Sequence, residues 1–153
     1  MRYLGIDPGA SGALVSLSDS GEHFDAYPFT GWKNAYAALS VYSTGGALCL
    51  LEKVHAMPKQ GVTSSFTFGK NTGGWVSLLE GLRIPYEEIT PQRWQKGVLG
   101  DIPSGESKKR ALDFCRKKFP NYDFSKALSN KAQSGIVDAL CMAIYIRAKN
   151  LQG

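Results

Sequence analysis

The sequence predicts an α/β domain in which helices pack on a mixed five-stranded sheet. Three observations support this prediction: short strands separated by tight turns at the start, a helical pattern followed by a buried strand, and amphipathic helices towards the end. In chain order the elements are βββαβαβ followed by helices, an order typical of a sheet covered by helices. The chain has 153 residues, enough for one domain with its own core, and we expect residues 1–153 to form it.

The first half of the chain predicts four of the strands. Short apolar runs over 2–7, 12–18 and 22–29 alternate with turns rich in Gly, Pro, Ser and Asp, which predicts an antiparallel meander. Apolar residues at helical spacing within 31–43 then predict a crossover helix. The continuous apolar run 46–52, which ends on an acid, predicts a buried strand parallel to the first one.

The second half predicts one more strand and four helices. In order, the expected elements are a loop over 58–65 rich in Gly, Ser and Thr, a helix over about 66–82, a strand over 86–89, a helix opened by Thr90 and Pro91, and helices over about 107–119 and 130–149.

Charge and cysteine content limit the function classes. Lys and Arg total 18 against 13 for Asp and Glu, a net charge of +5 that favours an anionic partner such as nucleic acid. Three cysteines without a CxxC motif predict buried, reduced thiols rather than disulfides or a zinc site. The apolar runs are too short to span a membrane and the first residues do not resemble a signal peptide, so we expect an intracellular, reducing location.

Three acidic residues stand where burial makes a charge unfavourable. Asp7 ends the first strand, Glu52 ends a parallel strand, and Asp138 interrupts an apolar helical segment. Because parallel strands have their carboxyl ends at the same sheet edge, Asp7 and Glu52 are expected to lie together. A buried carboxylate without a partner costs several kcal/mol, so the three acids require a cation.

Carboxylate oxygens are the ligands that Mg²⁺ and Mn²⁺ prefer. Two such ions about 4 Å apart, sharing carboxylates, are the apparatus of in-line phosphodiester hydrolysis. We therefore expect Asp7, Glu52 and Asp138 to hold Mg²⁺, with Mn²⁺ as a substitute, and two ions in the site.

Four segments resemble the RuvC-type Holliday-junction resolvases, especially the short phage-encoded and organelle-type members. They are LGIDPGASGAL, LCLLEKVHAMPKQGVTSSFTFGKNTGGW, ITPQRWQK and SGIVDALCMAIY. The resemblance extends through nearly the whole chain. It implies a ribonuclease H-like fold, a homodimer, and metal-dependent paired nicking of four-way DNA junctions. It also implies host cytoplasm or an organelle lumen as the location, and no small-molecule substrate.

The resemblance assigns catalytic and metal-binding roles to Asp7, Glu52 and Asp138. At Ser134 the sequence departs from the family pattern. The family pattern DGxxDA begins with an aspartate at this position, one helical turn before Asp138. A hydroxyl is a neutral and weak ligand, so a metal site is weakened. Three interpretations stay open: an active variant in which Ser134 holds a metal-bound water, an inactive junction binder, or an introduced substitution.

Basic and aromatic residues near the acids are candidates for DNA contact. The candidates are Lys59, Phe66, Phe68, Lys70, Arg93, Lys96, Lys108 and Lys109. Lys131 and Lys108 are also candidates for the scissile phosphate. Phe66 and Phe68 could instead anchor the next helix in the core. His55 could touch the metal site or DNA, or it could be a solvated loop residue.

Two further expectations complete the sequence-based account. DxGxxG after a first strand also resembles the phosphate-binding turn of actin-like ATPases. Those proteins need two lobes, whereas this chain has the length of one. A phosphate-binding turn also does not explain why Glu52 and Asp138 would lie together. For the homodimer, the aromatic helix around Trp75 to Leu82 is the expected interface.

Overall fold

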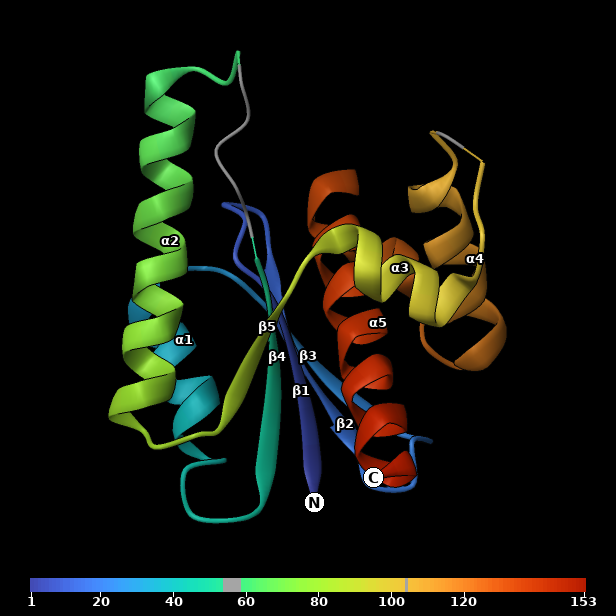
Figure 1. Cartoon of the computed structure of the whole chain (residues 1–153), viewed down its shortest axis with the longest axis horizontal. Helices are drawn as coiled ribbons and strands as arrows, with labels where there is room; N and C mark the ends of the chain where they lie inside the picture. The colour runs from blue at the N-terminus through green and yellow to red at the C-terminus, as the bar shows by residue number, and fades with distance from the viewer. Residues whose placement is uncertain (54–58, 104) are drawn as a thin grey trace.

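One mixed sheet organises the fold. The computed structural model describes residues 1–53, 59–103 and 105–153, so His55 lies outside the described residues. The sheet has the strand order β3-β2-β1-β4-β5 (Figure 1). Its strands are β1 (Arg2–Asp7), β2 (Ala13–Ser18), β3 (Phe24–Pro28), β4 (Ala47–Glu52) and β5 (Tyr86–Ile89).

The meander and the parallel pairing of β1 with β4 are those that the sequence predicts. β2 pairs antiparallel with both β1 and β3, which forms the meander. β4 pairs parallel with β1 on one side and with β5 on the other. The first and last strands of the parallel half therefore point the same way as β4, and their carboxyl ends meet at one edge of the sheet.

Helices follow the strands in the predicted order. They are α1 (Trp32–Ser40), α2 (Val62–Gly81), α3 (Pro91–Leu99), α4 (Ser107–Lys118) and α5 (Asn130–Gln152), with a short 3-10 turn over Phe124–Lys126. The loop predicted over 58–65 is wrong from residue 62 onward, because Ser and Thr disfavour a helix only weakly and the Ser65 N–H already bonds to the Gly61 carbonyl. Thr90 is the N-cap of α3, although its side chain makes no capping hydrogen bond.

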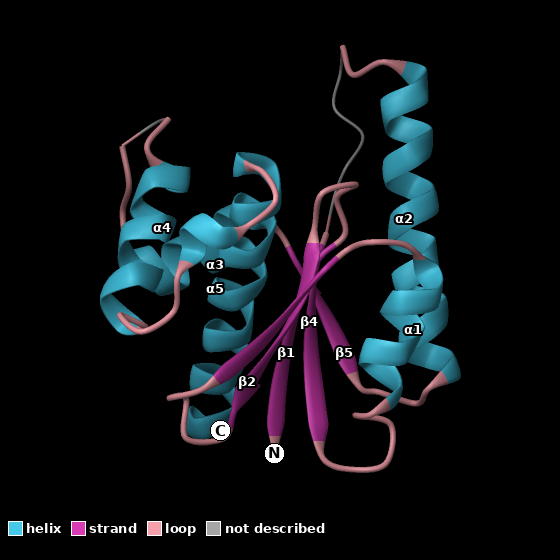
Figure 2. Cartoon of the chain, turned by 180° about the vertical axis from the view of Figure 1, so that it is seen from behind, coloured by secondary structure: helices cyan, strands magenta, loops and turns pink. Residues whose placement is uncertain are grey.

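The helices divide between the two faces of the sheet. α1 and α2 cover one face, and α3, α4 and α5 cover the other (Figures 1 and 2). Each face has its own hydrophobic core, with Trp75 and Leu79 of α2 on the first and Trp94 of α3 on the second. All three cysteines are buried and free, as predicted.

Trp75, the largest side chain of the helix expected to form the dimer interface, is not exposed, so the interface prediction is wrong for this residue. Trp75 is 1% exposed and packs against the sheet, and Leu79 beside it is fully buried. These two residues stabilise the monomer, since the apolar stripe of α2 already faces its own β-sheet. They are therefore not available to a second copy of the chain.

α5 packs against β1 with direct contact between backbones. A Cβ atom at Gly5 of β1 would overlap the carbonyl oxygen of Ala139 in α5. One turn earlier in α5, a Cβ atom at Gly135 would overlap the carbonyl oxygen of Ser11 in the β1–β2 turn. Glycine is thus required at both contacts, which bring the helix close to the end of β1.

No helix within the described residues is long and apolar enough to cross a membrane.

The contact at Gly5 leads to a stability prediction. We expect Gly5→Ala to lower the free energy of unfolding by about 3 kcal/mol or more, because the added methyl group overlaps a backbone that cannot move without shifting α5. The matched control is Gly73→Ala on the exposed face of α2, where a Cβ meets no atom within 4 Å. This control should stabilise the protein by up to about 1 kcal/mol. Urea denaturation measures both, and equal effects would contradict the prediction.

Candidate active site

Asp7 and Glu52 lie at the ends of neighbouring parallel strands. Ile6 is opposite Leu51 in the β1–β4 register, so the next residue along each strand is an acid. Side chains alternate between the faces of a sheet, and Gly5 and Leu50 lie on the face covered by α5. Two residues further along, Asp7 and Glu52 therefore also lie on the α5 face, at the same end of the sheet that the sequence predicts for both.

Asp138 reaches the same place from α5. It immediately precedes Ala139, the residue whose carbonyl oxygen contacts Gly5. Asp138 is partly buried between almost fully buried neighbours, Val137 and Ala139. The close contact of helix and strand thus brings the third acid to the sheet edge where the first two lie.

The three acids repel one another in a poorly solvated environment. Burial raises the pKa of Asp138 to about 8, and the charges of Asp7 and Glu52 contribute to that rise. Burial, together with repulsion from Asp7, raises the pKa of Glu52 to about 7. The pKa of Asp7 is also raised by burial, although a hydrogen bond from the Gly9 N–H opposes the effect. A cation placed among them would relieve this repulsion.

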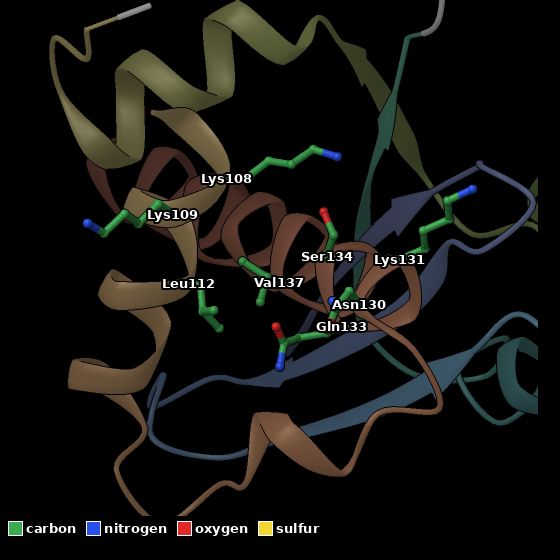
Figure 3. A pocket seen from close by; sticks show the side chains of 8 residues that line it. All are labelled: Lys108, Lys109, Leu112, Asn130, Lys131, Gln133, Ser134 and Val137. Atoms are coloured by element: carbon green, nitrogen blue, oxygen red, sulfur yellow. The ribbon is translucent and has the colours of Figure 1, made fainter. Parts of the chain in front are cut away.

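Lys108 of α4 provides a positive charge near two of the acids. Its ammonium group lowers the pKa values of Asp7 and Asp138, although burial outweighs its effect. Lys108 and Ser134 line the same pocket of about 370 Å³ between α4 and α5. In Figure 3 the Lys108 side chain extends above the Ser134 hydroxyl, whereas Lys131 points away from it on the other side. Ser134 thus lines the pocket beside Lys108, one helical turn before Asp138, without adding a negative charge.

Glu52 has a hydrogen-bond partner that the sequence analysis missed. The indole Nε1 of Trp94 in α3 donates to Glu52 Oε2 at 2.7 Å. Sequence reasoning considered Arg93 and Lys96 of this helix because they are charged, and it overlooked the aromatic residue between them. The sequence does contain a feature that could have identified Trp94. The helix opened by Pro91 follows directly after the strand over 86–89, so the residue of its first turn that faces the sheet lies near the end of β4.

The donor set fits a hard divalent cation. Within the part of the chain that the structure describes, no three Asp, Glu, His or Cys side chains are arranged to hold one metal ion by themselves. Mg²⁺ is usually held by one or two carboxylates, and water and substrate phosphates complete its ligands. The carboxylates of Asp7, Glu52 and Asp138 are thus a donor type that suits Mg²⁺ or Mn²⁺, provided that other groups complete the ligand shell.

Most of the candidate DNA contacts are exposed, and they come from several elements. α2, α4 and α5 all begin at the end of the molecule towards which β1 and β4 point (Figure 1). The exposed candidates are Lys59 before α2, Phe66 and Lys70 in α2, Arg93 and Lys96 in α3, Lys108 and Lys109 in α4, and Lys131 in α5. Phe66 is 72% exposed, so its alternative role as a core anchor is wrong, whereas Phe68 is partly buried.

Because burial and repulsion make the charged form of these acids unfavourable, replacing one of them with a neutral residue should stabilise the folded protein. Unfolded, the Asp138 carboxyl ionises near pH 3.8, whereas the folded protein retains the proton up to about pH 8. Folding therefore loses stability as the pH rises through this range. In metal-free buffer we expect Asp138→Asn to raise the melting temperature by roughly 5 °C at pH 7.5, and by less at pH 5.

The control for this measurement is Asp113→Asn, which changes an exposed acid of α4. Calorimetry on both variants at the two pH values measures the difference. A gain at Asp138 that is equal at pH 5 and 7.5, or no larger than that of the control, would contradict the electrostatic account.

Comparison with known proteins supports the fold. No protein-family model and no curated protein matches the sequence. Among solved structures, T. thermophilus RuvC in complex with a Holliday junction substrate is similar with a TM-score of 0.66 and 13% identity, over 97% of this chain and 96% of that chain. A second structure of Thermus thermophilus RuvC gives a TM-score of 0.62 and 14% identity, over 97% of both chains. The chain therefore has the ribonuclease H-like fold of RuvC, as the sequence predicts.

Proposed function

We propose that this protein is a metal-dependent endodeoxyribonuclease that resolves four-way DNA junctions by paired, symmetric nicks. The observation that carries the proposal is the cluster of Asp7, Glu52 and Asp138, three partly buried acids that repel one another at one edge of the sheet. A fold gains no stability from such a cluster. Its retention on a RuvC fold is best explained by the binding of Mg²⁺.

Each side chain has a defined task in this proposal. Bound Mg²⁺ would activate water and stabilise negative charge on the phosphate that is cleaved. Asp7, Glu52 and Asp138 provide the carboxylates that hold the metal, and Lys108 places a positive charge beside Asp7 and Asp138. Ser134 lines the pocket beside Lys108 and can accept or donate a hydrogen bond there. Lys109 and Lys131 line the same pocket and are exposed, so they suit contact with a DNA backbone.

The partner in this proposal is branched DNA, bound by a homodimer. Exposed cations on four elements suit the phosphates of a junction, and the exposed ring of Phe66 suits stacking on an unpaired base. Paired nicks across a two-fold axis require two active sites, and a dimer with an isologous interface supplies them. An intracellular, reducing compartment that contains DNA completes the proposal.

One alternative has a specific observation in its favour. Ser134 replaces an acid of the family pattern, and this replacement favours a catalytically weakened or inactive protein that binds junctions on the same fold. We prefer the enzyme because the other three acids are present together and lie beside Lys108. The actin-like phosphate cradle does not account for acids that converge from β4 and α5.

Substitution of a single acid tests the proposed metal site. We expect Asp7→Asn to lower the rate of junction nicking by more than about a hundredfold, because a neutral amide holds Mg²⁺ poorly. Junction affinity should stay within a few-fold of the native value, since Lys and Arg contacts to phosphates supply it. Gel assays of nicking and binding measure both quantities. Asp113→Asn is the matched control, and full nicking by Asp7→Asn would refute the assignment.

Restoration of the missing acid tests the role of Ser134. We expect Ser134→Asp to nick a four-way junction faster and at a lower metal concentration than the native protein, because a fourth carboxylate strengthens the weaker metal site. Mn²⁺ should stimulate the native protein more than Mg²⁺ does, since it binds such sites more strongly. Metal titrations of both proteins provide the test. Equal activity would place Ser134 outside the metal site, and two inactive proteins would favour the binding-only alternative.

A further inference from the structure

The hydrogen bond between Trp94 and Glu52 has properties that hydrophobic packing does not require. Trp94 is 1% exposed, and its ring lies in the core between the sheet and α5. Its only polar atom, Nε1, donates to Glu52 Oε2 at 2.7 Å, a short distance for a nitrogen donor. A tryptophan that only filled the core could direct this group elsewhere, whereas here the group meets one of the three clustered acids.

The local fold fixes this contact. Glu52 is opposite Ile89 in the β4–β5 register, and α3 starts only two residues after Ile89, at Pro91. Pro91 suits the first helical position because its ring sets the backbone angle that a helix needs. The only buried residue of α3 is Trp94, and the first turn of the helix therefore carries its indole back over the end of β4.

We propose that Trp94 is a positioning residue that holds the Glu52 carboxylate in the orientation required for metal binding. This inference rests on the function proposed above and adds a residue to it. The indole N–H holds Oε2 at a fixed place, so the carboxylate that lies beside Asp7 and Asp138 has a defined orientation. Because the ring is held rigidly in the core, the carboxylate does not have to be ordered when the metal binds.

The arrangement also joins the metal site to a helix that faces solvent. Arg93 and Lys96 are exposed on α3, whereas Trp94 of the same helix faces the core. A shift of α3 on DNA binding would therefore be transmitted directly to Glu52. A core-filling role alone predicts no such link, and it would make Trp94 equivalent to Trp75, which is equally buried in the other core.

The indole N–H itself provides a direct test in the native protein. The three tryptophans give three indole signals in a ¹H–¹⁵N NMR spectrum, and loss of one signal in Trp94→Phe identifies that of Trp94. We expect the addition of Mg²⁺ to shift the Trp94 signal and to leave those of Trp32 and Trp75 in place. A Trp94 signal that does not move while Mg²⁺ binds would overturn the proposal.

Metal affinity measured without DNA provides the second test. Titration calorimetry with Mn²⁺ should show a dissociation constant that is about 10- to 100-fold higher for Trp94→Phe than for the native protein. Trp75→Phe is the matched control, since it removes the same atoms from an equally buried residue on the opposite face, and its dissociation constant should stay within about threefold. Equal losses in the two variants would show general loosening of the fold and overturn the positioning role.

These measurements separate the two proposals. If the native protein binds no Mn²⁺, the metal site proposed above fails, and the positioning role of Trp94 fails with it. If the native protein binds Mn²⁺ and Trp94→Phe binds it equally well, only the positioning role fails. Neither outcome depends on nuclease activity.

Discussion

The direct contact between α5 and β1 is the constraint on which the candidate site depends. Glycine at position 5 allows the carbonyl oxygen of Ala139 to touch the strand, and Gly135 allows the same helix to touch the turn that follows Asp7. With side chains at these positions the helix would lie further away, and Asp138 would not share a poorly solvated space with Asp7 and Glu52. Two glycines therefore determine whether three separate acids form one site.

The site is arranged for function at the expense of stability. Burial and mutual repulsion raise the pKa values of Glu52 and Asp138 to about 7 and 8, so near neutral pH each charge opposes folding. Only part of this charge is balanced within the chain, by Lys108 and by the hydrogen bonds from Gly9 and Trp94. Under the function proposed above, a divalent cation would supply the remaining balance, and its binding would be coupled to the stability of the fold.

The sequence predicted the parts of the structure that follow from local pattern. Asp7 and Glu52 were predicted together because a register between parallel strands follows from topology, and Asp138 because an acid is conspicuous in an apolar helix. The helical start at Val62 was not predicted, since weak local preferences decide it. Trp94 was not identified because its role depends on a contact with a residue 42 positions away. The burial of Trp75 likewise follows from which face of α2 meets the sheet.

The most direct test of the account is the cleavage of a synthetic four-way junction by the native protein, with strand breaks mapped on all four strands. We expect nicks that require Mg²⁺ or Mn²⁺, that occur at symmetric positions in two opposing strands, and that are absent on linear duplex DNA of the same sequence. Tight junction binding without any nick at high Mn²⁺ concentration would contradict it and identify a protein that only binds junctions.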